Sequence, residues 1–325
     1  MAGSGPVLIA GTGALGSVVG GLLARAGWPV TLLGRRAHLD VVRSRGLRIE
    51  GLFGTHRVTG LSCAVSVEGL RGPYETVFLT VKAYDSEAMA AAVAPHLAPD
   101  GVLVSLQNGL GNLEAAARAV GGARVLGARV IFGAEVAEPG RARVTVYADP
   151  VLIGSPDPFD TRRRDAAVAW AADLTAAGIP AESSETIVAE LWAKLLYSAA
   201  LNPLGALLGL SYGALAADAD TRTTMDAVIE EAFAVAWADG VTLRWAAAED
   251  YREEFYRRLV PATAAHRSSM LQDLERGRPT EIEAINGWVA ARAAAHGVPA
   301  PVNATLTRLL RARARLPATE ARWSR

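Results

Sequence analysis

Lysine is rare in this chain, and where it occurs it could do chemistry that arginine does poorly. The chain carries 33 basic residues, and the only lysines among them are Lys82 and Lys194. A lysine ammonium can give up its proton and its pKa can shift, whereas a guanidinium stays charged. Both lysines are therefore candidates for proton transfer or for binding an anion. The alternative is that two basic positions kept lysine as solvated side chains, and composition alone does not separate these interpretations.

Lys194 begins a row of polar side chains in an otherwise apolar helical segment, residues 187–208. Ser198 and Asn202 follow at intervals of four, so all three project from one face of a helix. Such a row either faces solvent or lines a ligand-binding cleft. A solvated face is the commoner arrangement, but an isolated polar row in so apolar a helix fits a cleft better.

A glycine-rich stretch near the start of the chain can position a nucleotide. Residues 7–10 are apolar and predict a buried strand, which runs into Gly11, Gly13 and Gly16; a helix to residue 26 and a second strand, 29–33, follow. This order is typical of dinucleotide-binding units. The first glycine permits the tight turn, the second lets backbone approach a pyrophosphate, and the third lets the helix pack closely. An accidental glycine-rich turn is the alternative, against which the strand and helix context argues.

The end of the second strand indicates which dinucleotide is bound. In NAD-binding units an acidic residue about 20 positions beyond the glycines accepts from the ribose 2′-hydroxyl. Arg35 stands there instead. A guanidinium suits a 2′-phosphate, so the sequence favours NADPH over NADH. The alternative is an exposed arginine at a strand end.

Two further strands end in polar residues. Residues 76–81 lead into Lys82, residues 102–106 lead into Gln107 and Asn108, and a helix is expected over 86–97. Ligands of open α/β sheets lie beyond the carboxyl ends of the strands. We therefore expect Lys82 and Asn108 at the same edge as the glycine turn.

The rest of the chain predicts an α/β protein in which a Rossmann-type dinucleotide-binding domain precedes an all-helical domain. Residues 47–67 suggest short strands or a hairpin inserted in the sheet, and the later strands, 124–132, 142–147 and 151–153, are expected to be partly antiparallel. From about residue 185 the segments 187–208, 218–239, 246–276 and 281–295 are helical in period. We expect domains over 1–184 and 185–325, with the site in the cleft between them.

Composition narrows the partners. The 33 acidic residues balance the 33 basic ones, which gives no electrostatic case for nucleic acid or an anionic membrane. Cys63 can form no internal disulfide and no secretory signal pattern opens the chain, so we expect a cytoplasmic protein with a small-molecule partner. A homodimer stays open, because apolar helical faces serve a core or a partner equally well. No metal is expected, because no ligand spacing appears at His38, His56, His96, His266 and His296.

Together these features resemble the ketopantoate reductases, also called 2-dehydropantoate 2-reductases. The resemblance is carried by the glycine unit, Arg35, Lys82, Asn108, the Trp192-Ala193-Lys194-Leu195 and Asn202-Pro203 segments, and residues 268–288. It covers nearly the whole chain, and Ser-Ser-Met-Leu-Gln-Asp and Thr-Glu-Ile-x-x-Ile-Asn-Gly within the last block are specific to that family. It implies an enzyme that reduces a 2-keto acid with NADPH, in the first place 2-dehydropantoate to pantoate in pantothenate biosynthesis.

The resemblance also implies residue roles. Lys194 would be the catalytic general acid and Glu281 the acidic partner at the substrate. Asn108 would lie near nicotinamide and substrate, with Asn202 and Ser269 on the substrate and Lys82 and Arg35 on the cofactor. From the residues alone, however, Thr280-Glu281-Ile282-Glu283 is typical of a helix-capping box, in which an acid needs no further function.

Two positions depart from the family pattern. Ser198 and Tyr212 stand where these enzymes carry asparagines that contact substrate. A hydroxyl or phenol changes the hydrogen bonds that define the acid, which leaves a related 2-keto acid, or a larger one stacked on Tyr212, as alternatives. Reduction of another ketone or an imine also stays open, as does a nicotinamide-binding sensor without turnover. Lys194 argues against the sensor, because binding alone needs no proton donor.

Overall fold

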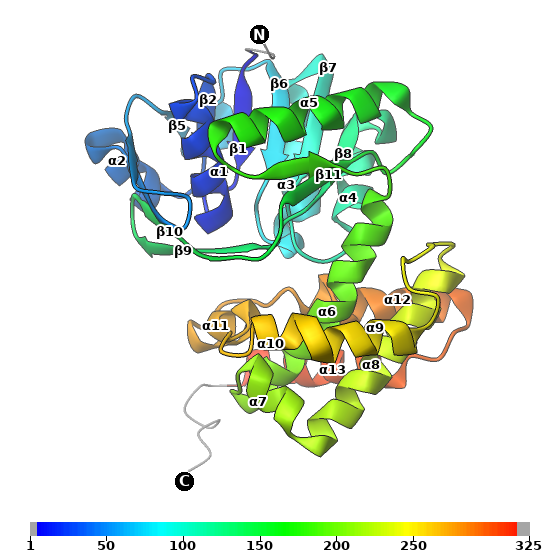
Figure 1. Ribbon diagram of the computed structural model, residues 1–325. Helices are drawn as coiled ribbons and strands as arrows, with labels where there is room; N and C mark the ends of the chain where they lie inside the picture. Colours follow the sequence, from blue (N-terminus) through cyan, green and yellow to red (C-terminus); the bar gives the residue numbers. More distant parts are fainter. Residues whose placement is uncertain (1–4, 317–325) are drawn as a thin grey trace. The chain divides into compact units, whose positions relative to one another are not determined.

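The chain folds into two compact units. The computed structural model describes residues 5–316, and contacts divide the chain into Met1–Val188 and Ala189–Arg325. The first unit is built on β-sheets and the second on helices, as Figure 1 shows. No helix among the residues that the structure describes is long and apolar enough to cross a membrane.

The first unit is organised around an eight-stranded sheet of order β12-β11-β8-β7-β6-β1-β2-β5. All neighbouring strands are parallel except β11, which runs antiparallel to β8. Strand β1 has β2 on one side and β6 on the other, so the chain reverses its direction of travel across the sheet there. Such a switch point is where open α/β sheets bind ligands. The strands are β1 (Val7–Ala10), β2 (Val30–Leu33), β5 (Ser62–Ala64), β6 (Tyr74–Leu79), β7 (Leu97–Ser105), β8 (Val125–Arg129), β11 (Val151–Gly154) and β12 (Ala181–Ser183).

Helices cover both faces of this sheet. Because successive side chains of a strand point to opposite faces, Val7 and Ile9 pack on one side and Leu8 and Ala10 on the other. The first side packs against α1 (Ala14–Arg25), α2 (Arg36–Arg45) and α5 (Thr161–Ala177), and the second against α3 (Ser86–Val93) and α4 (Asn112–Val120). Figure 1 shows α5 lying across the sheet. Strand β1 is therefore buried on both faces, which holds the turn that follows it in place.

A second sheet corrects one expectation from the sequence. Residues 47–67 do not form a hairpin inserted in the main sheet: β3 (Leu47–Gly51) and β4 (His56–Val58) join β9 (Phe132–Glu138) and β10 (Arg141–Tyr147) in a separate sheet of order β4-β3-β10-β9. Only β5 from this stretch enters the main sheet, beside β2. Strands β3 and β10 pair in parallel although they lie far apart in the chain. Local alternation predicts strands but not such distant partners.

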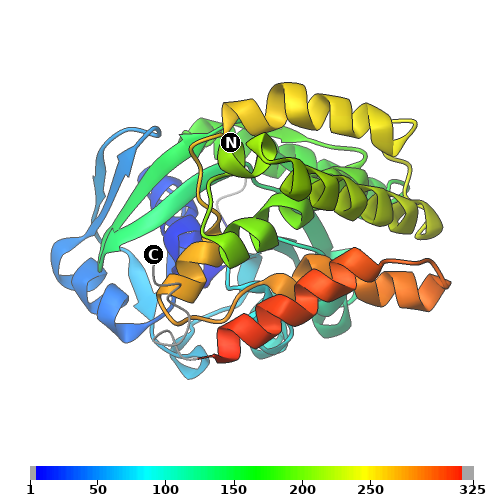
Figure 2. The same ribbon diagram turned by 90° about the horizontal axis from the view of Figure 1, so that it is seen from below.

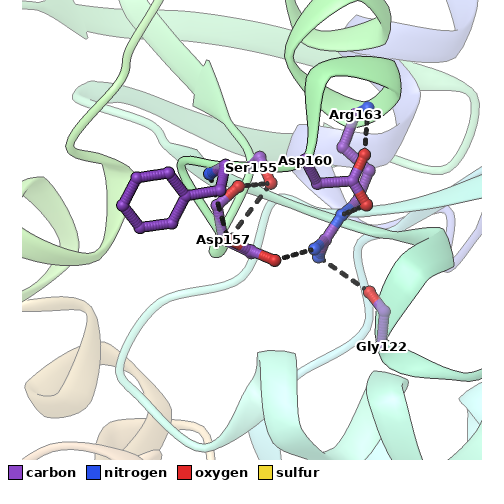
Figure 3. A network of polar contacts seen from close by, with 6 residues as sticks. Gly122, Ser155, Asp157, Asp160 and Arg163 are labelled. Carbon is purple, nitrogen blue, oxygen red and sulfur yellow. Dashed lines mark hydrogen bonds and ion pairs between the residues drawn. The ribbon is translucent and has the colours of Figure 1, made fainter.

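The loop between β11 and α5 is fixed by Arg163. Figure 3 shows its guanidinium reaching Asp160, Asp157 and the carbonyl of Gly122. The bonds measure 2.8 Å to Asp160 Oδ2, 3.3 Å to Asp157 Oδ2 and 2.8 Å to Gly122 O. Asp160 also caps α5 by accepting from the Arg163 N–H. This network is structural and joins the loop to the segment before β8.

The second unit is helical throughout its described part. Its elements are α6 (Ile187–Leu208), α7 (Tyr212–Ala217), α8 (Ala219–Ala238), α9 (Ala248–Glu254), a π-helical turn (Phe255–Leu259), α10 (Val260–Ala262), α11 (Ser269–Glu275), a 3₁₀ turn (Ile282–Ala284), α12 (Asn286–His296) and α13 (Pro301–Arg315). The segment 246–276, expected to be helical in period, is only partly helical, because a π turn and a non-helical stretch divide it. Helix α13, which begins with proline at a position that tolerates its missing N–H, was not among the expected helices. Figure 2 shows α13, in red, beside α12, in orange.

Candidate functional site

The glycine turn has the geometry that a dinucleotide site needs. Gly11 has a φ of 114°, and a Cβ there would lie 2.6 Å from the backbone nitrogen of Val81. A Cβ at Gly16 would lie 2.0 Å from the carbonyl oxygen of Gly11, so α1 packs against the turn only with glycine. At Gly13 a Cβ would meet nothing within 4 Å, so this backbone faces open space. The first and third glycines are thus required by close packing, and the second leaves room for a ligand.

The start of α1 fits a phosphate. Gly13 is its N-cap and has no side chain, so the N-cap residue makes no side-chain bond to the first N–H groups of the helix. Those groups carry the positive end of the helix dipole and bind anions. The hydroxyl of Thr12, in the same turn, is buried without a hydrogen-bond partner in the described chain. An uncapped helix N-terminus, open backbone and a buried unpaired hydroxyl together fit a dinucleotide pyrophosphate.

Arg35 lies directly beside this turn. A Cβ at Gly34 would come within 1.6 Å of the Thr12 hydroxyl oxygen, so the end of β2 rests against the glycine turn. Arg35 follows as the N-cap of α2, and both it and Arg36 are exposed. The structure therefore brings together the glycines and the arginine that the sequence singled out.

A buried hydrogen-bond network joins the loops that carry Lys82 and Asn108. Gln107 Nε2 donates to Val81 O at 2.9 Å and to Ser86 Oγ at 2.6 Å. Ser86 in turn donates to Asn112 Oδ1 at 2.6 Å, and Asn112 Nδ2 donates to the carbonyl of Asn108 at 2.9 Å. The three side chains in this chain of bonds are at most 5% exposed. The loops after β6 and β7 are therefore held as one unit.

Sequence reasoning assigned no part to these three network residues, Ser86, Gln107 and Asn112. In the sequence these residues stand out only as polar positions close to buried strands. Such positions are ordinarily taken as solvated loop residues. Lys82 is half-buried and Asn108 is exposed, both at the carboxyl edge of the parallel strands where the glycine turn lies. The hydrogen bonds of the network residues thus hold the two loops that form this edge of the sheet.

On the second unit, Lys194, Ser198 and Asn202 share one face of α6. The helix runs from Ile187 to Leu208, over the range that the periodicity predicts. The three polar side chains are half-buried, whereas most of their neighbours along the helix are fully buried. A row of this kind, set among buried leucines, is a candidate substrate-binding face.

Proline shapes this face. Pro203 stands inside α6 and has no N–H to donate to the carbonyl of Ala199, four residues earlier. Asn286 Nδ2 donates to that carbonyl at 3.1 Å instead. The next residue back from the proline, Asn202, has its carbonyl bonded by Ser268 Oγ at 3.3 Å. Side chains from α12 and from the N-cap of α11 therefore hold the interrupted stretch of α6 that carries Asn202.

Tyr212 is buried and contacts Asn202. Its residue is 3% exposed, and its hydroxyl donates to Asn202 Oδ1 at 2.5 Å. The ring packs against Tyr197 and His266, with centroid distances of 5.8 Å and 5.1 Å. The alternative in which a large keto acid stacks on this ring does not agree with the structure, because the ring offers no open face.

Glu281 and Glu283 lie in different environments. Glu281 is 7% exposed, whereas Glu283 is exposed and pairs with Arg311 of α13 at 2.5 Å. The capping box that Thr280 to Glu283 suggests does not form, because the 3₁₀ turn begins at Ile282 and its N-cap makes no side-chain capping bond. The burial of Glu281 therefore needs another reason than helix capping. Ser269 is exposed at the start of α11, directly after its N-cap Ser268.

Comparisons with known proteins define the class. The family model described as ketopantoate reductase PanE/ApbA matches residues 7–158, and the model of its C-terminal part matches residues 186–314. The fold and the matches define an oxidoreductase with an N-terminal dinucleotide-binding unit and a helical C-terminal unit. The chain belongs to the ketopantoate reductase family.

Individual relatives agree. The 2-dehydropantoate 2-reductases of Aquifex aeolicus and Archaeoglobus fulgidus are each 36% identical to this chain, and each match covers 94% of this chain and 96% of the relative. The crystal structure of a PanE/ApbA family ketopantoate reductase from Ralstonia eutropha superposes with a TM-score of 0.84 at 34% identity, covering 95% of this chain and 98% of that one. A D-mandelate dehydrogenase complex with NADH and anilino(oxo)acetate has a TM-score of 0.86 at 23% identity, covering 95% and 98%, and shares the fold.

Proposed function

We propose that the protein reduces 2-dehydropantoate to pantoate with NADPH, and that Lys194 is the general acid. The observation that carries the proposal is the row of Lys194, Ser198 and Asn202 on one face of α6 in a chain of this family. When bound, NADPH supplies the hydride. The protein supplies the binding groups and the proton. A cytoplasmic location suits the single free Cys63.

The cofactor is assigned to the first unit. Gly11, Gly13 and Gly16 let backbone and the start of α1 approach the pyrophosphate. Arg35 would pair with the 2′-phosphate, whose charge a guanidinium binds in a bidentate manner. Lys82 and Asn108, on the two loops joined by Gln107, would bind the rest of the cofactor, and Asn108 the substrate beside it.

The proton comes from Lys194. Hydride delivered to a ketone carbon leaves negative charge on the oxygen, which an ammonium stabilises and then protonates. Arginine could stabilise this charge but would donate its proton poorly. The buried carboxyl group of Glu281 is proposed as the acidic partner at the substrate, because its burial has no explanation in helix capping.

The substrate carboxylate needs donors. Asn202 and Ser269 are proposed to hydrogen-bond the acid, and Ser198 occupies the position between Lys194 and Asn202 on α6. Serine has one donor where an asparagine amide has two, so the acid is held differently from the family pattern. A related 2-keto acid is therefore the second candidate substrate, and another ketone or an imine the third.

A panel of 2-keto acids tests the proposal. NADPH oxidation is followed by absorbance with ketopantoate, its shorter and longer analogues, an aryl keto acid and a cyclic imine. We expect the highest kcat/KM with ketopantoate by a wide margin. A different acid at the top would move the substrate assignment, and no oxidation with any compound would indicate a nicotinamide-binding sensor instead of an enzyme.

A further inference from the structure

We propose that Tyr212 is a positioning residue that fixes the side-chain amide of Asn202, so that Asn202 offers only N–H donors to the substrate. The proposal rests on the proposed function and names the group that Asn202 would bind, a carboxylate or another acceptor. Tyr212 itself would not contact substrate.

The amide orientation follows from one hydrogen bond. An asparagine side chain has an acceptor end and a donor end. The Tyr212 hydroxyl donates to Asn202 Oδ1 at 2.5 Å, which occupies the acceptor end. Within residues 5–316, Asn202 Nδ2 has no hydrogen-bond partner, and the side chain is half-buried on the face of α6 that carries Lys194. The donor end is thus the one left for a ligand.

The phenol that sets this orientation is itself held on several sides. The Tyr212 ring lies at an interplanar angle of 81° to Tyr197 and packs on His266. Its backbone N–H donates to His266 O at 3.1 Å, and the next residue, Gly213, donates to Ala264 O at 2.8 Å. Burial raises the pKa of the Tyr212 phenol far above its ordinary value, so it remains a proton donor at any pH the protein meets.

The main chain of Asn202 is held as well. Ser268 Oγ donates to its carbonyl, and Pro203 fixes the backbone that follows. With main chain and amide both set in advance, little conformational freedom is lost when a ligand binds. Tyr212 therefore replaces the direct contact of the family asparagine with an indirect one, and the site should favour a carboxylate at Asn202 over a hydroxyl that needs an acceptor.

The variant Tyr212→Phe tests the inference, because it removes the hydroxyl and keeps the ring. The matched control is Tyr197→Phe, which removes a hydroxyl from the same aromatic cluster. The Tyr197 hydroxyl lies 2.5 Å from Thr263 Oγ1 and does not contact Asn202. We expect Tyr212→Phe to raise KM for the best 2-keto acid by about tenfold while kcat stays within about twofold, because binding is lost equally in ground and transition states. Tyr197→Phe should change KM by less than about twofold, and NADPH affinity should be unchanged in both.

A double-mutant cycle separates positioning from a general loss of structure. In an Asn202→Ala background, Tyr212→Phe should raise KM no further, because the amide it orients is gone. The proposal is overturned if Tyr212→Phe raises KM no more than Tyr197→Phe does, or if its effect is unchanged in the Asn202→Ala background.

Failure of the proposed function would look different. If wild-type protein oxidises NADPH with another keto acid of the panel, the same variants are compared on that acid. If it oxidises NADPH with none, calorimetric titration of the NADPH complex with ketopantoate measures binding directly. Weaker binding by Tyr212→Phe than by Tyr197→Phe supports the inference there too, and equal binding, or none to wild type, overturns it.

Discussion

Asn286 Nδ2 lies 3.1 Å from the carbonyl oxygen of Ala199, the acceptor that Pro203 leaves without its helical donor. Asn286 is fully buried, and its amide also donates to Asn303 Oδ1 of α13 at 2.9 Å. One side chain thus connects α12 to the interrupted part of α6 and to α13. The hydrogen bond from Asn286 thus replaces the one that Pro203 removes from the helix that carries Lys194 and Asn202.

Replacing Asn286 should destabilise the second unit. Asn286→Ala leaves two buried acceptors unpaired, and we expect the free energy of unfolding to fall by roughly 1–3 kcal/mol. Urea denaturation followed by circular dichroism measures it. In a Pro203→Ala background the Ala199 carbonyl regains a backbone donor, so Asn286→Ala should cost less there. An equal loss of unfolding free energy in both backgrounds would contradict the idea that Asn286 replaces the missing backbone donor.

Gln107 should matter for cofactor binding although we do not place it against the cofactor. Gln107→Leu removes the donor to the Val81 carbonyl and to Ser86, which releases the Lys82 loop from the Asn108 loop. We expect NADPH affinity to fall by about three- to tenfold, in keeping with roughly 1 kcal/mol for a neutral hydrogen bond. Fluorescence titration measures it. Ser105→Ala is the control: its hydroxyl donates to Gln107 Oε1 at 3.2 Å and does not join the two loops, so the change should alter affinity little. Equal effects of the two variants would argue against the network.

Arg35 should discriminate between the two nicotinamide cofactors. Arg35→Ala should weaken NADPH binding by about 10- to 100-fold, as expected for a bond to a charged group, and leave NADH binding nearly unchanged. Arg36→Ala, an adjacent exposed arginine, serves as the control. Equal losses for NADPH and NADH would remove the 2′-phosphate assignment.

His38 should make stability depend on pH. Its Nδ1 accepts from the Gly140 N–H at 3.1 Å and its Nε2 lies 3.1 Å from Ser17 Oγ, which requires a neutral ring. Burial lowers the pKa of His38 below its ordinary 6.5. The unfolded chain therefore binds a proton at higher pH than the folded chain. Stability falls as the pH drops below the ordinary histidine pKa of 6.5.

The variant His38→Gln should lose less stability than wild type between about pH 7.5 and about pH 5.5, measured as the change in Tm. Part of the wild-type loss should remain, because burial also lowers the pKa of His266. An identical loss in variant and wild type would contradict a role for His38.

The hydrophobic periodicity of the sequence predicts those elements whose burial is decided by neighbouring residues in the chain. The strand, glycine turn, helix and strand from β1 to β2 and the bounds of α6 are confirmed, because buried strands and helices impose their period on neighbouring residues. The pairing of β3 with β10 was missed, since it joins residues that no local pattern connects. The roles of Lys194, Glu281 and the other site residues remain predictions.

The supporting contacts of the candidate site could not be predicted. The bond between Tyr212 and Asn202 depends on where α7 begins relative to α6, and that between Asn286 and Ala199 on how α12 packs against α6. Residue types alone left Glu281 and Glu283 alike, and the family resemblance singled out Glu281 without saying how it is placed. The structure shows that Glu281 is buried and that Glu283 pairs with Arg311. The partners of these polar side chains come from elements that lie far apart in the sequence, so the sequence alone does not identify them.

The most direct measurement is the turnover of Lys194→Ala and Lys194→Arg with the best 2-keto acid under saturating NADPH. If Lys194 protonates the carbonyl oxygen, kcat should fall by about a hundredfold or more in both variants, because arginine keeps the charge but holds its proton. NADPH affinity should remain near the wild-type value. Wild-type turnover in Lys194→Ala would contradict the assignment of Lys194 as the general acid.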